Sequence, residues 1–174
     1  MKLTSTELTV LGLVIEQPRH GYDLEQVIER RGIRRWAEIG FSSIYYVLAK
    51  LEDRGLIESP GDQSGAKKRR VFRATAAGQS AAARAAVASI ADQQTVVHPM
   101  LAGLANAQLI SEDDYRDALR QRMIWISERI AALLAARQAQ APLPHAAHEV
   151  FSYSLSLLEA ERSWLAARVG VSND

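Results

Sequence analysis

The sequence predicts a mainly α-helical protein in two parts, with a short β-hairpin in the first part. Three observations support this fold class. Up to about residue 54, three short segments carry apolar residues at helical spacing. Residues 56–74 then contain two runs suited to strands, separated by turn-forming residues. Beyond residue 75 the apolar pattern is helical only.

The composition is that of an ordinary globular protein. The 174 residues are 48% hydrophobic and 24% charged, with a net charge of +1. The absence of cysteine excludes disulfides, thiolate zinc sites and cysteine catalysis. No segment resembles a signal peptide, and none approaches the roughly 18 apolar residues of a membrane span. We therefore expect a cytoplasmic protein with no membrane partner.

The first helix is expected to begin at Thr4, because Thr4-Ser-Thr-Glu7 fits a capping box, and to end at Pro18. Its buried face would be apolar: Leu8, Leu11, Val14 and Ile15.

A second helix is expected from about His20 or Gly21 to Gly32, followed by a connector over residues 33–41. The apolar contacts of this helix would be Tyr22, Leu24, Val27 and Ile28.

The third helix, expected over residues 43–54, has two chemically different faces. One face is apolar: Ile44, Val47, Leu48 and Leu51. The other carries Ser42 as a plausible N-cap, then Ser43, Tyr46 and Lys50, with Tyr45 at the boundary. Hydroxyls, phenols and one cation are poorly suited to catalysis. They suit hydrogen bonds to phosphates and base edges in a DNA groove.

A basic hairpin follows Gly55, which is expected to end the third helix. Strands over residues 56–59 and 70–74 would flank the turn-forming residues 60–65. Four cations lie near the tip and on the returning strand: Lys67, Lys68, Arg69 and Arg70. They would bind phosphates and make the affinity salt-dependent, and Lys68 or Arg69 could enter a minor groove. A short helix followed by a basic hairpin is typical of a winged helix-turn-helix domain, here with a two-stranded wing.

The charge distribution agrees with this prediction. Residues 1–80 carry 13 Lys and Arg against 10 Asp and Glu, whereas residues 81–174 carry 8 against 10. The basic excess lies in two patches, at residues 30–35 and 67–73. A charge run is usually only a solvated face, but two runs that flank a candidate recognition helix favour DNA as the partner.

The rest of the chain is expected to be helical. Thr75 would cap an alanine-rich helix, and Ser111 would begin a long helix through a second capping box. A loop over residues 139–145 would precede the last helix. We divide the chain into a DNA-binding domain, a connecting helix and an α-helical dimerisation domain: residues 1–78, 79–98 and 99–174.

The two long helices are expected to form an antiparallel pair, which buries only one side of each helix. The remaining apolar surface needs a partner, and a homodimer is the economical one. Trp125 and Trp164 are candidates for lining an aromatic ligand pocket, with packing at a dimer interface as the favoured role. The residues expected to serve dimerisation are Tyr115, Leu119, Met123, Ile126, Ile130, Phe151, Leu155, Leu158, Trp164 and Leu165.

Several of these residues have alternative interpretations. Tyr45 and Tyr46 could be ordinary surface or core aromatics, and we expect the Tyr45 ring to pack inward. Tyr22 begins the second helix, where N–H groups attract a phosphate, or it is a core aromatic. The wing cations could belong to a solvated loop.

Catalytic and metal-binding patterns are missing from the sequence. Among the histidines only His145-x-x-His148 has metal-like spacing, and no third ligand accompanies it. No Gly-rich phosphate loop, nucleophile elbow or dinucleotide fingerprint occurs. We therefore expect no catalytic residues, no metal and no cofactor.

Four segments occur in a characteristic order: Leu8-Thr-Val-Leu-Gly-Leu-Val, Pro18-Arg-His-Gly-Tyr-Asp-Leu24, Ser43–Ile57 and Arg70–Gly78. Across residues 3–78 the sequence resembles the PadR family of bacterial transcriptional regulators. The C-terminal half is similar, more loosely, to the longer PadR subfamily. There a helical domain ends in a Trp-Leu pair, here Trp164-Leu165, and mediates dimerisation.

The resemblance implies a homodimeric regulator, usually a repressor, that binds a palindromic operator. In some members a small aromatic compound releases it. It further implies that Tyr22, Ser43 and Tyr45 lie near the DNA backbone and that Lys50 is a basic position of the recognition helix. The sequence departs from the family pattern at Ala49, Lys68 and Ala74.

We expect, in sum, a sequence-specific repressor that binds double-stranded DNA and responds to a small aromatic or drug-like effector. Two alternatives come from other classes: a sequestering binder of hydrophobic small molecules, and a winged-helix adaptor that binds proteins.

Overall fold

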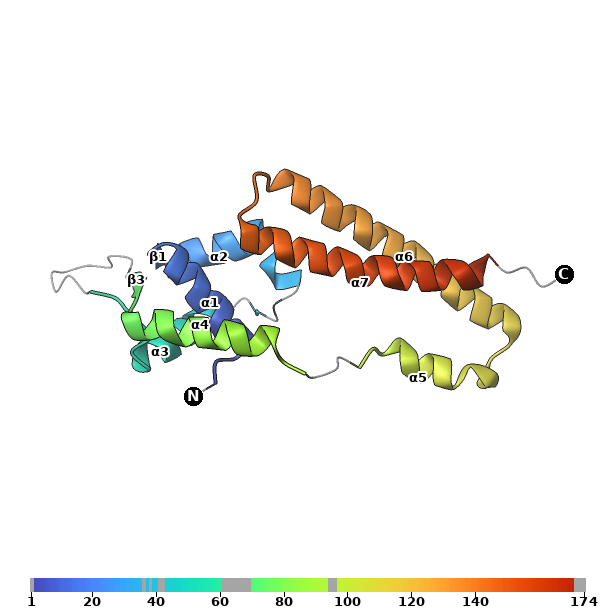
Figure 1. Ribbon diagram of the computed structural model, residues 1–174, viewed down its shortest axis with the longest axis horizontal. Coiled ribbons are helices and arrows are strands. Elements are labelled where there is room, and N and C mark those ends of the chain that lie inside the picture. The colour runs from blue at the N-terminus through green and yellow to red at the C-terminus, as the bar shows by residue number, and fades with distance from the viewer. Residues whose placement is uncertain are drawn as a thin grey trace. The chain divides into compact units, whose positions relative to one another are not determined.

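The computed structural model describes residues 2–35, 37, 39–40, 43–60, 70–93 and 97–170, without the side chains of Arg35 and Ser43. The chain forms two compact units, Met1–Gln94 and Thr95–Asp174. Over the described ranges, the first contains four α-helices and a small sheet, and the second is helical (Figure 1). Within the described residues, no helix combines the length and apolar character needed to cross a membrane.

Helix α1 (Ser5–Glu16) begins with the predicted capping box. The Glu7 N–H donates to Thr4 Oγ1 over 3.1 Å, and the Thr4 N–H donates to Glu7 Oε2 over 2.9 Å. Because α1 packs against both α3 and α4, its buried stripe is wider than one face. Val10 and Leu13 are therefore buried as well, whereas Ile15, predicted to be buried, is exposed.

Helices α2 (Gly21–Arg30) and α3 (Ser43–Asp53) form the helix pair of the unit, with a 3₁₀ turn, η1 (Ile33–Arg35), between them. Gly32 and Gly55 adopt positive φ angles of 62° and 66° just beyond α2 and α3, a conformation that favours glycine. The predicted apolar face of α3 is confirmed, since all of its members are buried: Ile44, Val47, Leu48 and Leu51.

The sheet has three antiparallel strands in the order β1-β3-β2. We predicted two, over residues 56–59 and 70–74. They form β2 (Ile57–Glu58) and β3 (Val71–Ala74), and the structure adds β1 (Arg19–His20). Strand β1 pairs with β3 so that Arg19 lies opposite Phe72. A two-residue strand has no detectable alternation, which is why the sequence pattern did not predict it. The predicted hairpin turn lies outside the described residues.

Helix α4 (Ala76–Ile90) begins at Thr75, whose hydroxyl accepts the Gly78 N–H over 3.0 Å, as predicted. A Cβ added at Gly78 would lie 1.9 Å from the Leu56 carbonyl oxygen, so the first turn of α4 lies against the backbone leading into β2. The helix then packs along α1. The largest fully buried side chains of this unit are Leu11, Leu24, Ile28, Ile44, Leu48, Leu51, Ile57, Val10 and Val14.

The second unit contains α5 (Met100–Ala105), the 3₁₀ turn η2 (Ala107–Leu109), α6 (Glu112–Ala139) and α7 (His145–Val169). The Ser111 hydroxyl caps α6 by accepting the Asp114 N–H over 3.1 Å. Helices α6 and α7 lie side by side as an antiparallel pair, drawn in orange and red in Figure 1.

The seam between α6 and α7 uses most of the residues that we assigned to dimerisation. Its buried members are Leu119, Ile126, Ile130, Leu155 and Leu165. Partly buried side chains complete it: Tyr115, Met123, Leu133, Leu158, Trp164 and Val169. Of the ten assigned residues, only Phe151, which is also buried, lies outside this cluster.

Candidate nucleic-acid interface

Three tyrosines are exposed where α2 begins and along the first turns of α3. Tyr22, Tyr45 and Tyr46 are 52%, 56% and 69% exposed. The core interpretation of Tyr22 is therefore wrong. So is the inward packing predicted for Tyr45. The residues around them in α3, Ile44 and Leu48, already fill the core.

The Tyr45 ring instead lies against Gly21, the first residue of α2. A Cβ built at Gly21 would be 2.6 Å from Tyr45 Cε1, so the ring occupies space that any other residue at position 21 would fill. Gly21 thus holds one face of the ring while the rest stays exposed. A phenol placed in this way has one ring face against the backbone and an accessible polar end, which suits a hydrogen bond to a phosphate.

Lys50, on the last turns of α3, contacts an acid of the same unit. Its Nζ lies 2.7 Å from Glu7 Oε1, and Arg54 Nη1 lies 3.1 Å from Glu7 Oε2. Burial alone would raise the pKa of the Glu7 carboxyl. Hydrogen bonds from Lys50 and the Thr4 N–H, with the charges of Lys50 and Arg54, hold that pKa below its usual value. Sequence reasoning found Glu7 only as a capping residue.

Of the predicted wing cations, Arg70 lies within the described residues, and its side chain contacts an acid and a hydroxyl of the same unit. Its guanidinium contacts the Glu52 carboxylate of α3 and donates from Nε to Ser59 Oγ over 2.9 Å. The same group lies 5.2 Å from the centre of the Phe72 ring. Arg70 therefore connects the base of the wing to α3.

The basic patch at residues 30–35 is partly neutralised by acids from α1 and α2. Arg31 Nη1 lies 2.8 Å from Glu16 Oε2. Arg34 contacts Glu25 over 3.5 Å and Glu29 over 3.4 Å. Counting charges along the sequence could not show these pairs, because Glu16 lies on a different helix from Arg31.

Some predicted contact residues cannot be placed. Ser42, Lys67, Lys68 and Arg69 lie outside the described residues. Ser43 begins α3, but its side chain is not among the described groups. The structure thus brings Tyr22, Tyr45 and Tyr46 to the surface together, and it places Lys50 and Arg70 against acids at the other end of α3.

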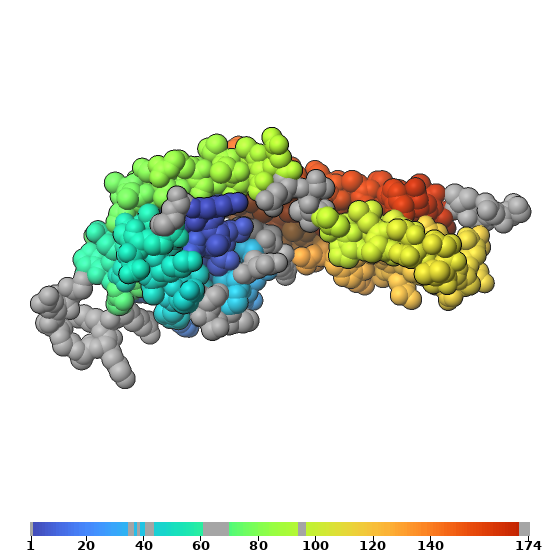
Figure 2. Space-filling view, turned by 90° about the horizontal axis from the view of Figure 1, so that it is seen from below, coloured from blue at the N-terminus to red at the C-terminus, as the bar shows by residue number. Residues whose placement is uncertain are grey.

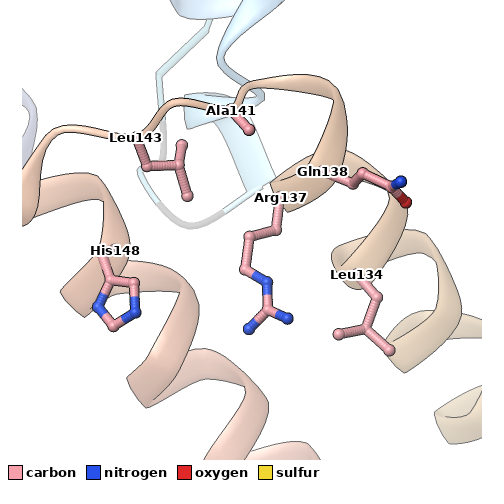
Figure 3. Close-up of a pocket in the computed structure, with 6 residues that line it drawn as sticks. All are labelled: Leu134, Arg137, Gln138, Ala141, Leu143 and His148. Atoms are coloured by element: carbon pink, nitrogen blue, oxygen red, sulfur yellow. The ribbon is translucent and has the colours of Figure 1, made fainter.

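A surface pocket of about 620 Å³ lies in the second unit, where α6 ends and α7 begins. Figure 3 shows the Arg137 and His148 side chains pointing toward the same space. The predicted ligand residues lie elsewhere: Arg122 covers the Trp125 ring at 4.5 Å, and Arg168 covers the Trp164 ring at 3.7 Å. The pocket is lined by Leu134, Arg137, Gln138, Ala141, Leu143 and His148.

Across the part of the chain that the structure describes, no three His, Asp or Glu side chains gather in a way that could hold a metal ion.

Residues 10–84 match the model of the "Transcriptional regulator PadR-like family". No similar sequence was found among curated proteins. Among solved structures, the chain is similar to Bacillus subtilis PadR in complex with operator DNA, with a TM-score of 0.75 and 18% identity over 95% of this chain and 98% of that one.

Two other structures extend this likeness. One is Bacillus subtilis PadR in complex with p-coumaric acid, with a TM-score of 0.77 and 18% identity over 95% of this chain and 97% of that one. The other is the PadR-like transcriptional regulator BC1756 from Bacillus cereus, with a TM-score of 0.71 and 16% identity over 94% of both chains. The winged-helix fold and the helical second unit are therefore those of the PadR structures.

Proposed function

Residues 10–84 carry a PadR-like family domain, and on that premise we propose that the protein is a homodimeric transcriptional repressor that binds a palindromic DNA operator. The observation that carries the proposal is the exposed face of α3. Its opposite face is buried, so its tyrosines are presented on a rigid helix. A helix held in this way reads base edges when it lies in a major groove.

In the proposed complex, α3 enters the major groove and the wing follows the adjacent backbone. Tyr22 and Tyr45 would contact phosphates, since they lie together at the start of α2, where helix N–H groups also favour anions. Tyr46 is the most exposed of the three tyrosines and would reach into the groove. Residues 67–70 would add phosphate contacts from the wing.

The second unit would bring two copies together. Its seam is filled within one chain, yet large apolar side chains remain exposed on both long helices. A surface of this kind is typical of a protein-protein interface, and a second copy supplies a matching one. The exposed side chains are Ile124, Trp125 and Leu134 on α6, and Val150, Tyr153 and Leu157 on α7.

An effector would bind in the pocket between the ends of α6 and α7. Arg137 and His148 could hold a carboxylate, while Leu134 and Leu143 line the pocket with apolar groups. A small aromatic carboxylate combines both features, and p-coumaric acid is named as the ligand of one similar structure. The proposal includes no catalytic step.

A binding titration tests this function. Fluorescence anisotropy would compare DNA from upstream of the protein's own gene with a scrambled duplex at several salt concentrations. We expect the upstream DNA to bind at least about 10³-fold more tightly at physiological salt. Equal affinity for both duplexes would contradict sequence-specific regulation. It would favour the adaptor or the sequestering binder instead.

A further inference from the structure

Glu7 is the buried charge of the first unit. Among the described residues it is the charged side chain that reaches full burial, with 3% of its surface exposed. A capping box needs no such burial, because capping residues usually lie at the surface of a helix end. The position of this carboxylate therefore calls for a second explanation.

Three donors from two helices converge on the Glu7 carboxylate. Lys50 Nζ lies 2.7 Å from Oε1, while Arg54 Nη1 lies 3.1 Å and the Thr4 backbone nitrogen 2.9 Å from Oε2. Lys50 lies in the last turn of α3, and Arg54 directly follows that helix with its N–H donating to the Lys50 carbonyl over 3.2 Å, so the two side chains project from the same side. Figure 2 shows α1, in dark blue, beside α3, in teal.

This arrangement fixes the end of α3 against the beginning of α1. On another side of the same helix, Glu52 contacts Arg70 at the base of the wing. The exposed tyrosines lie at the opposite end of α3, and a helix transmits a tilt at one end to the other. The contacts of Glu7 therefore hold the end of α3 that lies opposite Tyr45 and Tyr46.

The pairing also determines what Lys50 can do. The Lys50 ammonium is paired with the buried Glu7 carboxylate over 2.7 Å, although 45% of the lysine side chain is exposed. Release of that ammonium would add one mobile cation at the C-terminal end of the recognition helix. Each additional phosphate contact strengthens binding to any DNA sequence alike.

We propose that Glu7 is a positioning residue for DNA recognition, which orients α3 through Lys50 and Arg54 and keeps Lys50 from binding phosphates. This inference rests on the proposed function. Loss of the carboxylate lowers the preference for the operator by two routes: α3 loses its orientation, and Lys50 becomes a non-specific phosphate contact.

The test measures the operator preference of Glu7→Gln, defined as its affinity for upstream DNA divided by its affinity for scrambled DNA. We expect this ratio to fall about tenfold, on the scale of one mismatched base pair. The salt dependence of binding to scrambled DNA should steepen by about one phosphate contact. Asp53→Asn is the matched control, because it removes one exposed carboxylate from the end of α3.

The second variant, Lys50→Gln, tests the assignment even if Glu7→Gln fails to fold. We expect its salt dependence to equal that of the wild type, because the ammonium is already held by Glu7. A slope reduced by about one phosphate contact would instead make Lys50 a direct contact and overturn the proposal. In the double variant, the steeper slope of Glu7→Gln should disappear.

These outcomes distinguish a failure of the positioning role of Glu7 from a failure of the proposed function. If the wild type discriminates and Glu7→Gln discriminates equally well, the positioning role of Glu7 is wrong and the proposed function stands. If the wild type itself binds both duplexes equally, the proposed function fails, and the positioning role fails with it.

Discussion

The two units use their apolar residues in different ways. In the first, the apolar faces of α1, α2 and α3 are buried against one another and the sheet, and the exposed aromatics among the described residues are tyrosines. In the second, α6 and α7 bury one stripe each and expose Trp125, Tyr153 and Leu157. The first unit buries its apolar faces within itself and presents tyrosines at its surface. The second unit leaves large apolar side chains exposed, as one side of a protein-protein interface does in the free protein.

The end of α4 departs from this pattern in the first unit. Val87 and Ile90 are exposed there, although the beginning of the same helix packs closely against Leu56. Ile15 on α1 is exposed as well, so the described part of the first unit also presents some apolar side chains to the surface.

The largest effect should come from a charge on the exposed face of α7. Leu157→Glu would place a carboxylate in the proposed interface, and we expect the dimer dissociation constant to rise about a hundredfold, or ~3 kcal/mol. Sedimentation velocity measures this change. Ser156→Glu is the control, since it adds the same charge on another side of α7. If both variants remain dimeric at equal concentration, the interface lies elsewhere.

Two glycines should respond to alanine with opposite signs. Gly78→Ala forces a methyl group against the Leu56 carbonyl, which should lower the free energy of unfolding by ~1–3 kcal/mol. Gly12→Ala meets no atom within 4 Å in the middle of α1, and should raise that free energy by ~0.5–1 kcal/mol. Urea denaturation followed by circular dichroism measures both. A stabilised Gly78→Ala variant would disprove the close contact of α4 with the segment before β2.

The stability of the first unit should depend on pH through Glu7. Because the pKa of this carboxyl in the folded protein lies below the ordinary 4.5, its contribution is present above pH 4.5. It is lost as the pH falls through the folded value. The free energy of unfolding should therefore decline more steeply in the wild type than in Glu7→Gln between about pH 5 and pH 3. Parallel curves would mean that Glu7 has an ordinary pKa.

The smallest effect on DNA binding should follow from Gly21→Ala. The added methyl group would displace the Tyr45 ring, which can rotate away, so the fold should survive. Operator affinity should fall several-fold, about 1 kcal/mol, because one placed hydrogen bond is lost. A DNA titration at fixed salt measures it. Tyr45→Phe is the companion variant, and unchanged binding in both would remove Tyr45 from the contact surface.

The sequence pattern correctly predicted those features that depend on residues close together in the chain. The capping box at Thr4 and the buried face of α3 follow from residues three or four apart, and both are confirmed. The contact of Tyr45 with Gly21 and the pairing of Lys50 with Glu7 join residues far apart in the sequence, and no periodicity encodes them. The other predicted wing cations, Lys67, Lys68 and Arg69, lie outside the described residues, so their role stays a prediction.

The dimerisation residues illustrate a different limit. The apolar spacing of Leu119, Ile126 and Ile130 correctly marked one face of α6 as buried. A periodic pattern states that a face is covered but does not state by which helix, and α7 of the same chain covers this one. We therefore assign the proposed interface to exposed side chains outside the buried face between α6 and α7, such as Ile124 and Leu157.

Hydroxyl-radical footprinting of the full-length protein on its upstream DNA tests the central claim most directly, because it reports both groove contact and pairing of two copies. We predict two protected segments whose centres lie one helical turn, about 34 Å, or a multiple of it apart. A single protected segment, or uniform weak protection along the duplex, would contradict a dimer that reads DNA with one α3 helix from each copy.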